Sequence, residues 1–255
     1  MVVLHVGVVY SLTMRFDITG GDQAVDRTLA AIVLDDPAAA RVLEGHRLDY
    51  CCGGQRTLAD ACAELDLDPA LVLADLDAVD HASPADWASL GPAALVDHLE
   101  ATHHRCLHDE LPRLAVLVAK VAGVHGARHP ELHEVQAAFT ALRLDLEPHL
   151  MKEERILFPM VRELAAAAEA PTFHCGTLAN PIRMMLLEHD RAGELLAALR
   201  GFTGDYEPPA DGCASYEALY RGLAELEADT HLHVHKENNV LFPAVLALEA
   251  ALAAR

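Results

Sequence analysis

The sequence predicts an all-α protein in which a small N-terminal helical domain precedes an up-down four-helix bundle. Three observations support this fold class. Alanine and leucine are abundant while aromatic residues make up only 5% of the chain, a mix that favours helices over strands. Four long stretches with helical patterning follow residue 92, separated by segments that contain glycine or proline. An eleven-residue sequence frame also recurs within these stretches.

The small helical domain is predicted to span residues 15–80. Short helices are expected at Ala24–Leu34 and Pro37–Leu43, and two more should begin after Thr57 and Asp68, which are candidate N-caps. Between them lies the Cys-Cys-Gly-Gly motif, residues 51–54, which its glycines predict to be a turn.

The segments on either side of this domain differ in composition. Residues 1–14 are apolar but lack a basic start and a cleavage signal, so we expect a disordered leader, with Met14 as an alternative start. Residues 81–92 contain two prolines, a glycine and the only tryptophan, and are predicted to be a linker.

The bundle is predicted to occupy residues 93–255. Its helices are expected at about 93–122, 131–168, 180–200 and 214–250. Connections of the length between them join antiparallel neighbours in an up-down bundle.

The charge and cysteine content exclude several classes of protein. The formal net charge is −20, which repels nucleic acid and anionic membranes, so neither is an expected partner. No segment has the length and apolarity of a transmembrane helix. The six cysteines include no C-x-x-C pair and form no secreted framework, which predicts a reducing cytoplasm.

The repeated eleven-residue frame contains the candidate metal ligands. HLMKEERILFP begins at His149, and HVHKENNVLFP begins at His233, 84 positions later. Residues four apart share one face of a helix, so His149 can act with Glu153 and His233 with Glu237. Imidazole and carboxylate ligands suit iron, manganese or zinc, and a carboxylate can bridge two ions. The frame therefore predicts a bound pair of metal ions.

Each half of the bundle also offers a histidine on its other helix. His104 lies 45 residues before His149, and His189 lies 44 residues before His233. From spacing alone, His103 and His108 remain alternatives to His104. A ferritin-type centre is disfavoured because Glu100–His103 is the only E-x-x-H match, and the absence of H-E-x-x-H leaves a metalloprotease unsupported.

These residues resemble a known family. The two H-x-x-x-E motifs resemble the haemerythrin-like domain. The segment DYCCGG from Asp49, followed by Thr57-Leu-Ala and Cys62, resembles the small domain of the Repair of Iron Centers family. The resemblance implies a haemerythrin-like bundle holding two iron ions with an oxo or hydroxo bridge. The ligands that it implies are His104, His149, Glu153, His189, His233 and Glu237.

The resemblance also implies a function. It predicts a cytoplasmic stress-response protein that repairs iron–sulfur clusters after nitrosative or oxidative damage, by iron donation or nitric oxide chemistry. Its expected partners are nitric oxide or oxygen species and damaged iron–sulfur proteins, with a homodimer as a further option. Whether the protein is an enzyme that reduces nitric oxide stays open. An oxygen- or nitric-oxide-binding carrier or sensor is the alternative, and a protein-interaction module is a third.

Several other residues invite hypotheses about the site. Asp145, one turn before His149, and Glu188, beside His189, are candidates for a proton relay. Cys51 and Cys52 are candidate thiols for iron or nitric oxide, with a packed turn as the alternative. Pro148 removes a helical hydrogen bond, so a kink is expected beside the site. Burial is expected for Cys62, Cys106 and Cys213.

Overall fold

The computed structural model describes residues 24–79 and 86–254. No strand is present in these ranges, and the expected all-α class is confirmed. The predicted leader, residues 15–23 and 80 of the predicted small domain, and residues 81–85 of the predicted linker lie outside them. Within them, we find no helix with the length and apolar character needed to span a bilayer.

Four short helices form the N-terminal unit, a name we use for residues 24–79. They are α2 (Leu29–Asp35), α3 (Ala39–Gly45), α4 (Leu58–Glu64) and α5 (Pro69–Ala78). The predicted N-caps are confirmed, because the Thr57 side chain accepts a hydrogen bond from the Asp60 N–H and that of Asp68 from the Ala70 N–H.

The helix predicted at Ala24–Leu34 is interrupted in the structure. Ala24 and Val25 are helical, but α2 begins only at Leu29, because Thr28 is extended and its side chain caps the helix by accepting from the Ala31 N–H. Thr28 also pairs with Thr57 in an isolated antiparallel bridge, which ties the starts of α2 and α4 together.

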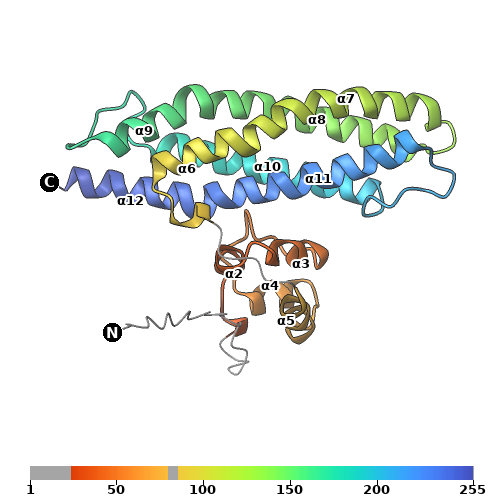
Figure 1. Ribbon diagram of the computed structural model, residues 1–255, viewed down its shortest axis with the longest axis horizontal. Helices are drawn as coiled ribbons and strands as arrows, with labels where there is room; N and C mark the ends of the chain where they lie inside the picture. Colours follow the sequence, from red (N-terminus) through yellow and green to blue (C-terminus); the bar gives the residue numbers. More distant parts are fainter. Residues whose placement is uncertain (1–23, 80–85, 255) are drawn as a thin grey trace, which may run out of the picture.

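Four long helices form the bundle, and they run side by side in Figure 1 with alternating direction. After the short 3-10 helix η1 (Asp86–Ser89), the first is α6 (Pro92–Leu99), η2 (Glu100–His104) and α7 (Arg105–His125). The second is α8 (Glu131–Lys152), η3 (Glu153–Leu157) and α9 (Phe158–Ala166), and the third is α10 (Ala179–Phe202). The fourth is α11 (Ala214–Lys236), η4 (Glu237–Leu241) and α12 (Phe242–Ala253).

The elements η2, η3 and η4 are π-helical turns, which the sequence did not predict. Such turns insert a wider hydrogen-bonded ring into an α-helix and occur often at functional sites. The α-helical pattern of α8 continues through Pro148 and gives way only at Glu153. Pro148 does not cause the π turn, since η4 begins at the equivalent Glu237 with no preceding proline.

Two apolar clusters fill the bundle, one toward each end. One includes Leu107, Phe139 and Tyr216, and the other includes Leu99, Phe158 and Phe242. The six predicted ligands lie along the helices between these two clusters. The apolar core on both sides excludes water from the space that the ligands share.

The N-terminal unit packs against α11, as Figure 1 shows. Val234 of α11 belongs to the same apolar cluster as Leu29, Leu43 and Leu58 of the N-terminal unit. The predicted burial of cysteines holds for Cys62 but is wrong for two others. Cys106 lies on the exposed face of α7, and Cys213 is the exposed residue that precedes α11.

Candidate metal centre

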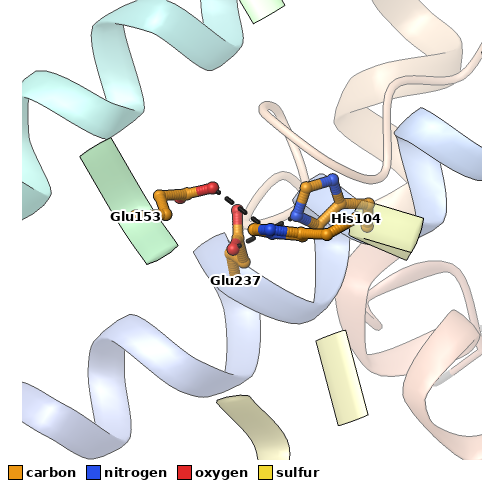
Figure 2. Close-up of side chains that lie close together, drawn as sticks. His104, Glu153 and Glu237 are labelled. Carbon is orange, nitrogen blue, oxygen red and sulfur yellow. Dashed lines mark ion pairs between the residues drawn. The ribbon is translucent and has the colours of Figure 1, made fainter. Parts of the chain in front are cut away.

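Six buried side chains from the four bundle helices converge at one place. His104 ends η2, His149 lies in α8, His189 in α10 and His233 in α11, while Glu153 and Glu237 begin the π turns η3 and η4. The histidines are 1–2% exposed and both glutamates are fully buried. Figure 2 shows His104, Glu153 and Glu237 pointing toward one another from three different elements. The structure thus brings together all six residues that the sequence singled out.

The six side chains form two overlapping groups, each able to hold one ion. One group contains His104 and His233, the other contains His149 and His189, and both include Glu153 and Glu237. Each group therefore combines one histidine from each half of the bundle. Glu153 and Glu237 belong to both groups, and each carboxylate carries two oxygens that can act as ligands.

The nitrogen and oxygen atoms that could bind a metal face one another, and most of them have no hydrogen-bond partner among the described residues. The histidine Nε2 atoms lie 3.2–3.5 Å from the carboxylate oxygens, and Nε2 of His149 lies 3.2 Å from Nε2 of His189. Nε2 of His104 and His233 and all four carboxylate oxygens are buried with no hydrogen-bond partner among the described residues. Two ligands about 2.1 Å from one ion at a right angle lie about 3 Å apart, so this spacing fits a metal centre.

The electrostatics of the site favour a cation. Burial would raise the pKa of the Glu237 carboxyl, but His233 and His189 hold it well below its ordinary range. Burial would likewise lower the pKa of His149, but Glu153 and Glu188 raise it to about 10. Two fully buried carboxylates are costly unless they are paired with positive charge or bound to metal.

Three of the four histidines have their outer nitrogen fixed by an acceptor. Nδ1 of His104 donates to Glu154 at 3.0 Å, Nδ1 of His149 to Glu188 at 2.8 Å, and Nδ1 of His189 to Asn238 at 2.7 Å. Such partners set the tautomer and orient the ring, leaving Nε2 free for an ion. Sequence reasoning missed Glu154 and Asn238. Their positions in the sequence could have indicated them, because each directly follows the ligand glutamate of its copy of the frame.

Comparison with known proteins agrees with this geometry. Residues 95–245 match the family model described as the hemerythrin HHE cation binding domain, and residues 25–80 match that of ScdA_N, a domain of unknown function. The chain is 36% identical over 225 residues to the iron-sulfur cluster repair protein YtfE of Shigella boydii serotype 4, covering 88% of this chain and 98% of that one. The Escherichia coli O17:K52:H18 protein of the same name gives the same identity and coverage.

The chain therefore belongs to the family of these iron–sulfur cluster repair proteins, in which a ScdA_N domain precedes a haemerythrin-like domain. The resemblance drawn from the repeated frame and the Cys-Cys-Gly-Gly motif is thereby confirmed. It covers both the N-terminal unit and the bundle, since the two family models together account for most of the described residues.

The other histidines near the centre take part in different contacts. The ring of His103 stacks on that of His233, with its Nδ1 2.8 Å from Asp229 and its Nε2 2.6 Å from the buried Lys236 amine. His108, the alternative ligand, is 52% exposed and lies 2.7 Å from Glu154. Of His103, His104 and His108, it is therefore His104 that lies with Glu153 and Glu237 in a possible metal-binding group.

The two candidates for a proton relay are placed differently. Glu188 contacts His149 and also forms an ion pair with Lys152, and its side chain is 29% exposed, so it joins the site to solvent. Asp145 instead lies 3.7 Å from Arg191, and its side chain is 46% exposed. The geometry therefore favours Glu188 for contact with a ligand histidine.

The two adjacent cysteines line a cavity of about 650 Å³ between the N-terminal unit and the bundle. The Cys51 thiol donates to the Asp49 carboxylate at 3.2 Å and lies 3.9 Å from the Cys52 sulfur. Its hydrogen bond with Cys52, together with burial, raises the pKa of Cys51 well above its ordinary value. Asp49 also accepts bonds from three backbone N–H groups of the turn, so it stabilises the local structure.

Proposed function

We propose that this protein is a non-haem di-iron protein of the cytoplasm that repairs iron–sulfur clusters after nitrosative or oxidative damage. The single observation that supports it most is the pair of histidine groups sharing two buried glutamates. The relatives that match nearly their whole length are named iron-sulfur cluster repair proteins, which supports the same activity here.

The donor set fits iron. His104 and His233 would hold one ion, His149 and His189 the other, and Glu153 and Glu237 both. Imidazole with carboxylate is a ligand set that iron accepts readily. The bound centre would supply redox chemistry toward nitric oxide or oxygen species and a ferrous ion that can be given to a damaged cluster.

The protein's own residues prepare this site. Glu154, Glu188 and Asn238 orient three of the histidines, so little reorganisation is needed when an ion binds or leaves. The rings of Phe158 and Phe242 lie 5.2 Å from His104 and 6.0 Å from His189, and they shield the site from one end of the bundle. Glu188 offers a path for a proton between His149 and solvent.

A repair assay tests the proposal. The iron-loaded protein is added to a dehydratase whose [4Fe–4S] cluster has been damaged by nitric oxide, and recovery of the dehydratase activity is followed. We expect recovery with the wild-type protein and little with Glu153→Ala, which removes a donor from both positions. Arg155→Ala, at an exposed position two residues away, serves as the matched control and should behave like the wild type.

Two results would contradict the proposal. One is an iron-loaded wild-type protein that restores no activity. The other is a Glu153→Ala variant that restores activity as well as the wild type. Reversible oxygen binding without any repair would favour the carrier or sensor instead.

A further inference from the structure

The two copies of the repeated frame differ at the positions that surround their shared ligands. His235, Asn238 and Asn239 of the second copy correspond to Met151, Glu154 and Arg155 of the first. In the second copy all three contact the N-terminal unit, through the carbonyl groups of Tyr50 and Cys51. In the first copy Met151 and Arg155 are exposed to solvent. Among the described residues, only the second copy of the frame is therefore joined to the N-terminal unit by hydrogen bonds.

Asn238 connects a candidate metal ligand directly to that unit. Its Oδ1 accepts a hydrogen bond from Nδ1 of His189 at 2.7 Å, and its Nδ2 donates to the Cys51 carbonyl at 3.3 Å. The amide is planar and its two ends are engaged at once. A displacement of the Cys51 carbonyl therefore turns the amide, and with it the acceptor that holds the His189 ring.

The equivalent residue of the first copy makes no such connection. Glu154 lies 3.0 Å from Nδ1 of His104 and 2.7 Å from Nε2 of His108, and both histidines belong to the first bundle helix. The contacts of Glu154 among the described residues thus stay within the bundle. Asn238 thus links the His149–His189 position to the N-terminal unit. Glu154 links the His104–His233 position only to another residue of the bundle.

The contact between η4 and the turn at Cys51 is closely packed around Asn238. Asn239, the next residue, donates to the Cys51 carbonyl at 3.0 Å and accepts from Nε2 of Gln55 at 2.9 Å. At Gly54, an added Cβ would lie 2.3 Å from the Tyr50 carbonyl and 3.0 Å from Nδ2 of Asn239, so only glycine allows this approach. The turn that carries the two cysteines is therefore held directly on η4.

We propose that Asn238 is a positioning residue through which the docked N-terminal unit sets how tightly the His149–His189 position holds its ion. The inference rests on the proposed di-iron function and deepens it. With the unit docked, the Cys51 carbonyl keeps Oδ1 of Asn238 toward His189. If the unit moved away, the amide would be free to rotate, His189 would lose its orienting partner, and the His149–His189 position would hold an ion less tightly.

The test follows iron release from the full-length protein. The iron-loaded chain is mixed with a ferrous chelator that becomes coloured on binding, and the release is recorded with time. We expect two phases from the wild type, one for each position. Asn238→Leu should speed one phase by about 10- to 100-fold, the range typical of lost partners of metal-bound histidine, and leave the other unchanged.

A second variant separates coupling from local damage. Asn239→Ala removes contacts to the N-terminal unit but touches none of the four ligand histidines. We expect it to speed the same phase as Asn238→Leu, by a smaller factor. Arg155→Ala, the equivalent position of the first copy, is the matched control and should change neither phase. Thermal unfolding followed by circular dichroism checks that each variant is folded.

The outcomes distinguish this inference from the di-iron proposal. If Asn238→Leu speeds one phase while Asn239→Ala changes nothing, the coupling to the N-terminal unit is contradicted. Equal acceleration of both phases by Asn238→Leu contradicts it as well. A wild-type protein that releases a single iron in one phase would instead count against the di-iron centre itself.

Discussion

The two halves of the bundle contribute the same ligands from very different surroundings. In the first copy of the frame, the face around Met151 and Arg155 is open to solvent. In the second copy, the equivalent face carries His235 and Asn239 and lies under the N-terminal unit. Ligand positions and docking positions thus occupy separate faces of the same helical turn. One half can acquire a binding surface while both retain the histidine and glutamate that the centre needs.

The buried chemistry of the two halves is alike, and its loss should have the largest effect. Glu153→Ala and Glu237→Ala each remove a carboxylate that both metal positions share. Each variant should therefore retain about one iron per chain or less after reconstitution, since a centre that loses a shared ligand binds neither ion well. Metal analysis by plasma emission spectrometry checks this. Full iron content in either variant would mean that the carboxylates are not shared ligands.

The apolar packing of the two halves should also be equivalent. Phe158 and Phe242 are the matching residues of the two frames, both buried, and each lies beside a ligand histidine. Replacement of either by Ala should lower the free energy of unfolding by about 3–5 kcal/mol, because a large cavity is left in the core. Urea denaturation measures this difference. If the free energy of unfolding fell much less in one of these two variants than in the other, the apolar packing of the two halves would not be equivalent.

A smaller effect is expected at the residues that orient the histidines. Glu154→Leu removes the acceptor of His104 in the first half, just as Asn238→Leu removes that of His189 in the second. We expect about a 10-fold loss of affinity, confined to the His104–His233 position. Competition with a chelator of known affinity measures it. If Glu154→Leu lowered the iron affinity of the same position as Asn238→Leu, the two residues would not orient histidines of different metal positions.

Much of this arrangement could be predicted from the sequence because it depends on local patterns. The four helices follow from apolar periodicity and from the glycines and prolines between them. His149 with Glu153, and His233 with Glu237, follow from a four-residue spacing that a helix places on one face. The repetition of the frame made a metal pair the natural interpretation. The choice of His104 needed the resemblance, because His103 and His108 lie on the same helix.

Other features depend on tertiary contacts that no local pattern encodes. Each ligand group draws one histidine from each half of the bundle, which follows from helix packing. The π turns at Glu153 and Glu237 have no signature that separates them from ordinary helix. The docking of the turn at Cys51 onto Asn238 joins residues almost 190 positions apart, a separation for which a single sequence offers no periodic signal.

The proposed function depends on two ions that share Glu153 and Glu237. The most direct test is anaerobic reconstitution of the wild-type protein with ferrous iron, followed by iron analysis and Mössbauer spectroscopy. We expect about two irons per chain in the wild type, and about one or fewer in Glu237→Ala, with a matching loss of Mössbauer absorption. A wild-type protein that binds fewer than about one iron per chain would contradict it.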